Sequence, residues 1–111
     1  MERRSNERYR VWFPMSVVTD DGEEGTAITY DVSSTGLLMA CPGSLAPGSH
    51  VSLRFKVGEG EARVVAAQII RREENQEGDT GPWRYRMAVR FDEPHPELES
   101  LLQAETEEDP R

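Results

Sequence analysis

Cysteine, histidine and long apolar runs are all scarce in this sequence. The single cysteine, Cys41, excludes an intramolecular disulfide and fits the reducing cytoplasm, where we expect this protein to reside. Two histidines, His50 and His95, leave little material for a zinc site, and we expect both to be solvated loop residues. No run approaches the roughly 18 apolar residues of a membrane-spanning helix, so we expect no membrane insertion.

Basic residues are also in the minority. The 111 residues include 13 Lys and Arg against 21 Asp and Glu, a formal net charge of −8. Because non-specific binding of DNA or RNA needs a broad basic surface, this charge argues against a nucleic-acid partner. The charge is unevenly placed, however: residues 1–10 carry a local +2 and residues 92–111 a local −7. An acidic chain therefore has a basic N-terminal segment and a strongly acidic C-terminal segment.

What the sequence does contain is a repeated alternation of apolar and polar residues. Val51, Leu53, Phe55 and Val57 alternate with polar residues, and residues 83–91 alternate as regularly, which is typical of half-buried strands. Gly and Pro clusters separate these segments from four similar ones. Six short strands predict a mainly β fold, a small antiparallel barrel or sandwich. The expected strands span residues 11–19, 26–33, 36–39, 51–57, 62–72 and 83–91.

One short helix of about two turns is expected near the C-terminus. Pro96 suits a first helical position, and Leu98, Leu101 and Leu102 then fall on one face. Because short isolated helices are marginal, this helix must dock on the barrel. We therefore expect three parts: a flexible leader over residues 1–10, a domain with its terminal helix over 11–104, and an acidic disordered tail over 105–111.

Arginines are concentrated in the leader. Arg4 and Arg8 are separated by three residues, and Arg3 lies beside the first of them. A guanidinium offers a planar fork of donors that fits phosphate oxygens or the O6/N7 edge of guanine. Such a leader can close over a bound anion, but the same residues also fit a solvated basic leader that has no ligand.

A second polar cluster follows the strand expected over residues 26–33. Regular alternation predicts three core-facing residues in this strand: Ile28, Tyr30 and Val32. The other three then share the opposite face: Thr29, Asp31 and Ser33. This face would be open to a ligand.

The chemistry of this cluster fits a guanine nucleotide. Asp31 can accept paired N–H bonds from a guanine edge, and Ser33 can donate to a phosphate oxygen. Gly36 can adopt a positive φ and let a ligand approach the backbone. The plainer alternative is a hairpin turn, because Asp, Ser and Gly are ordinary turn residues.

Together the two clusters resemble the motifs of the PilZ domain family. These are Arg4-x-x-x-Arg8 before the first strand and Asp31-x-Ser33-x-x-Gly36 between the second and third. The resemblance extends over nearly the whole chain. It implies a six-stranded antiparallel (split) β-barrel with a short C-terminal helix, and a binding site for the bacterial second messenger cyclic di-GMP.

The resemblance also implies a role for each residue. Arg4 and Arg8 would hold guanine and phosphate groups, Asp31 a guanine edge and Ser33 a phosphate, while Gly36 would shape the turn. An arginine before the motif, here Arg3, tends to accompany an intercalated cyclic di-GMP dimer in the family. On the fifth strand Arg71 or Arg72 can replace the guanine-stacking aromatic of some members.

The expected function is that of a receptor rather than an enzyme, since no catalytic constellation is present and no cofactor is expected. With no second domain expected in so short a chain, ordering of the leader would present a new surface to a downstream partner protein. The family's usual outputs are motility, surface polysaccharide and biofilm control. The alternative is an adaptor that binds no nucleotide. Trp12 and Phe13 can form a stacking platform, but core or barrel rim is the commoner role of such aromatics.

Overall fold

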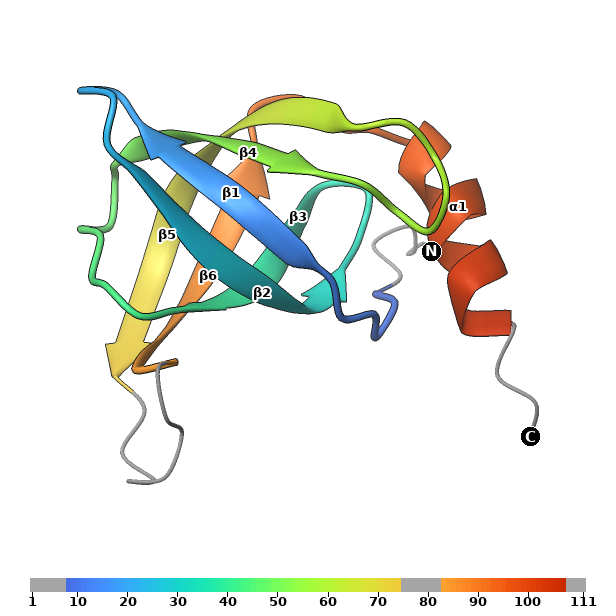
Figure 1. Ribbon diagram of the computed structural model, residues 1–111, viewed down its shortest axis with the longest axis horizontal. Helices are drawn as coiled ribbons and strands as arrows, with labels where there is room; N and C mark the ends of the chain where they lie inside the picture. The colour runs from blue at the N-terminus through green and yellow to red at the C-terminus, as the bar shows by residue number, and fades with distance from the viewer. Residues whose placement is uncertain (1–7, 75–82, 108–111) are drawn as a thin grey trace, which may run out of the picture.

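The computed structural model describes residues 8–74 and 83–107, with side chains up to residue 104. Within these residues the chain forms six strands followed by one helix (Figure 1). The elements are β1 (Pro14–Thr19), β2 (Glu24–Val32), β3 (Gly36–Cys41), β4 (His50–Phe55), β5 (Arg63–Glu74), β6 (Tyr85–Phe91) and α1 (Glu97–Glu107). Each predicted strand is present, with its ends shifted by a few residues.

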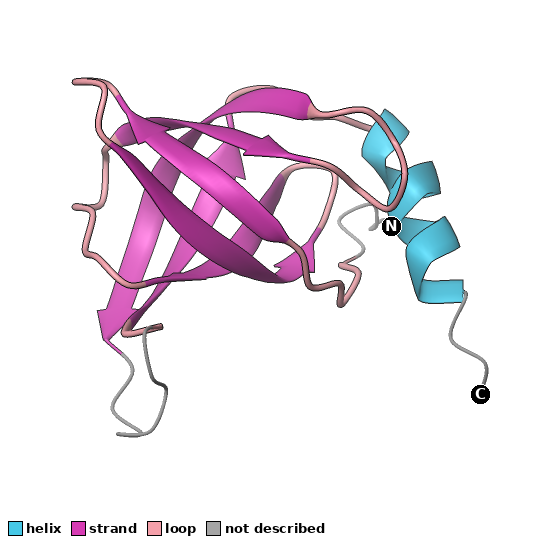
Figure 2. Ribbon diagram, viewed as in Figure 1, coloured by secondary structure: helices cyan, strands magenta, loops and turns pink. Residues whose placement is uncertain are grey.

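The six strands close into one barrel (Figure 2). Their order around the ring is β1-β2-β3-β6-β5-β4, and every pairing is antiparallel. The pairing of β1 with β4, with Ser16 opposite Arg54, completes the ring. The predicted fold class, a six-stranded antiparallel barrel with a C-terminal helix, is confirmed.

The barrel interior is filled by the apolar residues of the alternating patterns. Every second residue is buried in β4, and in β6 from Met87 onward, which confirms the alternation there. The largest fully buried side chains include Leu37, Met39, Leu53, Ile69 and Met87. Side chains that point inward from all six strands therefore form one core.

Helix α1 covers one end of the barrel (Figure 1). Leu98 and Leu102, four residues apart and so on one face, are both 0% exposed and belong to the core. Arg63 at the start of β5 bonds the Glu97 carboxylate at 3.0 Å. The helix has 11 residues and reaches Glu107, beyond the predicted boundary at residue 104. No helix among the described residues has both the length and the apolar character needed to cross a membrane.

The predicted facing of β2 is wrong over most of its C-terminal half. Thr29 is fully buried, whereas Ile28 and Tyr30 are only partly buried. The register with β3 shifts between Thr29 and Asp31, which is a β-bulge. A bulge inserts one extra residue into the strand, so the simple alternation breaks at this point. After the bulge Val32 faces the core as predicted.

Candidate functional site

The segment that precedes β1 lies against the end of β2. Tyr9 and Val32 exchange two backbone hydrogen bonds, of 2.8 and 3.0 Å. The hydroxyl of the buried Thr29 donates to the Val11 carbonyl at 2.7 Å and accepts from the Phe13 N–H at 3.0 Å. The chain that follows Arg8 is therefore fixed to the bulged part of β2.

This arrangement brings the two sequence clusters together through Arg8 and Asp31. The Arg8 guanidinium donates to the carboxylate of Asp31, which follows it by 23 positions in the sequence. The side chains remain 52% and 24% exposed, respectively. Ion pairs this open to solvent contribute little stability, so a ligand can replace this contact at small cost. Arg3 and Arg4 lie outside the described residues.

Ser33 closes the turn between β2 and β3. Its N–H donates to the Gly36 carbonyl at 2.8 Å, and its hydroxyl oxygen accepts from the N–H groups of Thr35 and Gly36 at 3.1 and 3.2 Å. Ser33 is 1% exposed, so the predicted solvent-facing position is wrong. The hydroxyl serves the backbone of a tight turn, as Ser side chains often do.

Backbone hydrogen bonds from residues 91 and 95 fix the other side of the same turn. The Phe91 N–H donates to the Thr35 carbonyl at 2.8 Å, and the His95 N–H donates to the Ser34 carbonyl at 2.7 Å. The turn that follows Asp31 is thus fixed between β6 and the start of α1.

His95 lies in the loop between β6 and α1, as expected, but its side chain is only 25% exposed and is not solvated. Its ring packs edge-on against Phe91 at 5.6 Å, and its Nδ1 lies 3.3 Å from the Glu97 carboxylate. Its role is to join the barrel to the helix. His50 is exposed, as expected, but it opens β4 rather than lying in a loop.

Gly36 is needed for a reason other than the predicted one. Positive φ angles occur at Gly22, Gly48 and Gly58, but not at Gly36. A Cβ at Gly36 would lie 2.3 Å from the Val89 carbonyl oxygen of β6. The glycine therefore permits a close approach of two strands, not an unusual backbone conformation.

One row of outward-facing residues crosses the barrel from Asp31. Asp31 lies opposite Leu38 of β3, which lies opposite Ala88 of β6, which lies opposite Arg71 of β5. With neighbouring strands about 4.8 Å apart, the backbones of Asp31 and Arg71 are about 14 Å from each other. Arg71 thus shares this face, with the smaller partly buried Leu38 and Ala88 in between. Arg72 instead bonds the Ser44 hydroxyl at 2.7 Å.

A further arginine on this side of the barrel, Arg86, was not among the predicted site residues. The Arg86 guanidinium lies over the Tyr30 ring, 5.3 Å from its centroid. Trp12 contacts the same ring edge-on, at 6.3 Å. The alternation along residues 83–91 already places Arg86 on the polar face of this strand, but it does not show that the guanidinium meets Tyr30.

The described residues contain no group of three His, Cys, Asp or Glu that could hold a metal ion. Cys41 is buried, and burial raises the pKa of its thiol to about 11. The thiol therefore stays protonated at neutral pH and is a poor nucleophile. What the site offers is recognition through an arginine, a carboxylate and a fixed turn.

Comparisons with known proteins agree with the observed fold. A model of the PilZ domain matches residues 2–108. No curated protein matches the chain in sequence. Among solved structures, the motility inhibitor MotI/DgrA of Bacillus subtilis is similar at a TM-score of 0.72 and 18% identity. The match covers 100% of this chain and 55% of the other, so the chain spans about half of that protein.

Two solved PilZ domains are also similar in fold. The PilZ domain of YcgR from Escherichia coli, solved with c-di-GMP, has a TM-score of 0.67 and 22% identity over 92% of this chain and 87% of the other. The PilZ domain of CeSA, from a cellulose-synthesising bacterium, has a TM-score of 0.59 and 24% identity over 87% and 91%. The resemblance to PilZ domains, which rested on the arginine motif and on the motif that begins at Asp31, is confirmed. The chain belongs to the PilZ domain family.

Proposed function

We propose that this chain is a receptor for cyclic di-GMP. The observation that carries the proposal is the Arg8–Asp31 ion pair, which brings the two family motifs to one place on the barrel. The ligand is compact, carries two negative charges and presents two guanines. Arginines next to one acceptor carboxylate complement both kinds of group.

In this proposal a guanine edge takes over the contact that Arg8 now makes with Asp31. Its N–H groups bond the Asp31 carboxylate, and Arg8 turns to a phosphate or to the O6/N7 edge of a guanine. Arg3 and Arg4 join from the leader, and Arg3 favours an intercalated dimer. Arg71 bounds the far side of the same face.

Ser33 and Gly36 contribute mainly through the turn. The Ser33 hydroxyl holds the turn closed, and Gly36 lets β3 lie close to β6. The phosphate contact that the resemblance assigns to Ser33 requires its buried hydroxyl to rotate outward. The leader, once ordered by the ligand, would present a new surface to a partner protein, and a motility output is one candidate because MotI/DgrA is an inhibitor of motility.

Calorimetric titration with cyclic di-GMP tests the proposal. We expect the wild-type chain to bind, and Arg8→Ala or Asp31→Ala to weaken binding by about 1.5–3 kcal/mol, the range for a charge-assisted hydrogen bond. Asp20→Ala is the matched control, because Asp20 is exposed in the β1–β2 turn, away from Asp31. This variant should bind cyclic di-GMP with the affinity of the wild type. Equal affinity of the Arg8 and Asp31 variants and the wild type would contradict the site.

The second candidate is an adaptor that binds no nucleotide. It is favoured by the same ion pair, because Arg8 and Asp31 satisfy one another and can simply hold the leader on β2. In that case the wild type gives no heat with cyclic di-GMP. The Arg8→Ala variant would then lose partner binding instead.

A further inference from the structure

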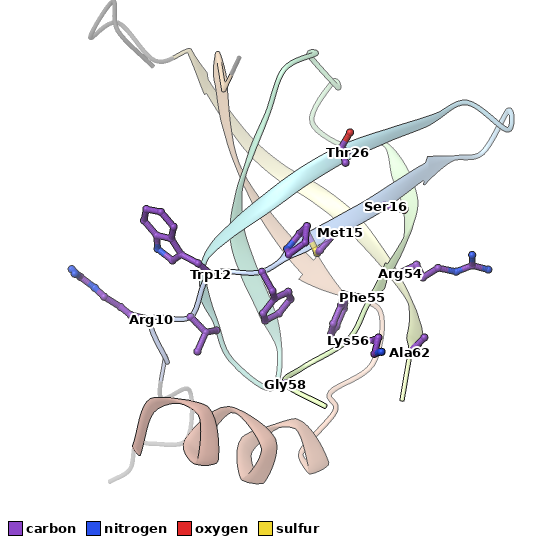
Figure 3. A pocket seen from close by; sticks show the side chains of 13 residues that line it. Arg10, Trp12, Met15, Ser16, Thr26, Arg54, Phe55, Lys56, Gly58 and Ala62 are labelled. Carbon is purple, nitrogen blue, oxygen red and sulfur yellow. The ribbon is translucent and has the colours of Figure 1, made fainter. Parts of the chain in front are cut away.

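A wide hollow opens between the start of β1 and the end of β4. It has a volume of about 880 Å³. In Figure 3, Arg10 and Trp12 lie at one side of it and Arg54 and Lys56 at the other, with Phe55 between them. Asp31 and Arg8 are not among its lining residues, so the hollow is distinct from the Arg8–Asp31 pair, although Trp12 on its rim also contacts Tyr30.

The rim of this hollow is positively charged. Arg10, Arg54 and Lys56 are all exposed, and no Asp or Glu lines the surface. Within the described part of the chain none of these three cations forms an ion pair. Three cations around one hollow, each without an ion-pair partner among the described residues, are unexpected in a protein whose net charge is −8.

The floor of the hollow is apolar and partly open to solvent. Phe13 stacks on Phe55, with centroids 5.3 Å apart and an interplanar angle of 26°. Trp12 is 70% exposed, the most exposed large hydrophobic residue described. Val64, which lies opposite Arg54 in the sheet, is 63% exposed and extends the apolar surface along β5. Trp and Arg side chains in such settings are typical centres of protein interfaces.

We propose that this hollow docks an acidic segment of a partner protein that carries an aliphatic or aromatic side chain. The segment's carboxylates complement Arg10, Arg54 and Lys56, and its apolar side chain covers Phe13 and Trp12. A short acidic segment fits better than nucleic acid, because the acidic remainder of the molecule repels a long polyanion. The closed ring has no free strand edge, so docking depends on side chains.

The hollow is connected to the proposed nucleotide site through one short segment. Arg10 and Trp12 follow Arg8 by two and four residues, and the intervening backbone is bonded to Thr29 and Val32. We expect a ligand that displaces Arg8 to shift this segment, and with it one side of the hollow. Only this regulatory role rests on the proposed function, because docking itself needs no nucleotide.

Titration of the full chain with synthetic peptides, followed by NMR and by fluorescence anisotropy, tests the docking without nucleotide. The probe is a fluorescein-labelled peptide of Asp and Glu around a central Leu-Phe pair. We expect saturable shifts at the Trp12 indole and at the amides of Arg54 and Lys56, with none at Trp83. A peptide with Lys in place of the acids, and one with Gly-Ser at its centre, should both bind at least about tenfold more weakly.

Two variants and one control locate the effect. The double variant Arg54→Glu, Lys56→Glu should bind the acidic peptide at least about tenfold more weakly than the wild type does. Trp12→Ala should bind it about tenfold more weakly. Arg84→Glu makes the same kind of charge change at an exposed position outside the hollow and should change affinity less than about twofold. All these positions are exposed, so the folded state should be kept.

Three outcomes would overturn the inference. These are no shifts at the hollow, equal binding of the acidic and basic peptides, or tighter binding of oligo(dT) than of the acidic peptide. Each is independent of the cyclic di-GMP titration, so this inference and the proposed function can fail separately.

Discussion

At Gly36 the backbone of β3 passes β6 with no room for a side chain. A Cβ there would overlap the Val89 carbonyl oxygen, which cannot move without disturbing the β3–β6 pairing. At Ser33, two residues beyond Asp31, the hydroxyl bonds the backbone of the turn. Two of the motif residues therefore act through the backbone that carries Asp31.

We expect Gly36→Ala to lower the free energy of unfolding by about 1–3 kcal/mol, as overpacking does in tightly packed sites. Urea denaturation measures the change. Gly43→Ala is the control, because nothing lies within 4 Å of its Cβ position and its φ is not positive. A Gly36→Ala variant as stable as the control would show that the strands separate easily at this point.

Cys41 gives a pH-dependent prediction. Burial raises the pKa of its thiol from 9.0 to about 11 in the folded protein. Between these values the folded chain keeps a proton that the unfolded chain has lost, so stability falls as pH rises from 9 to 11. The stability difference between wild type and Cys41→Ala should therefore change by about 2–3 kcal/mol over that range. A constant difference would mean that the thiol is accessible to water.

At the scale of elements, the regular patterns were predictable and the irregular ones were not. The alternation in β4 and β6 and the leucine spacing in α1 identify buried faces directly, because one period holds along each element. In β2 the bulge after Thr29 changes the facing, and no residue in the sequence marks it. The burial of Ser33 was missed for a different reason: the strand pattern was extended beyond Val32, where β2 ends and a turn begins.

Helix α1 should contribute more to stability than its length suggests. Leu98 is fully buried in the barrel core, so Leu98→Ala should lower the free energy of unfolding by about 2–5 kcal/mol. Leu101→Ala should cost less, because Leu101 is only partly buried. The His95 amide, which bonds the Ser34 carbonyl, should also exchange faster in the Leu98 variant. Unchanged exchange at His95 would mean that the turn is held without the helix.

At the scale of the whole molecule, bulk charge and local charge lead to different conclusions. A net charge of −8 argues against long nucleic acids but not against a compact anion, because cations are gathered at particular places. The pairing of Arg8 with Asp31 joins residues that are far apart in the sequence. Composition and periodicity do not predict such a pair, and the family resemblance implied only that the two motifs contribute to one ligand site.

The central claim is that cyclic di-GMP binds where the two motifs meet. The most direct measurement is an NMR titration of the full chain with cyclic di-GMP, following the amides of the leader and of residues 31–36. We predict saturable shifts at Arg3, Arg4, Arg8 and Asp31, and in Asp31→Ala the shifts of the leader should need roughly 10- to 150-fold more ligand to saturate. Saturable binding with shifts confined to other parts of the barrel, or no binding at all, would contradict the account.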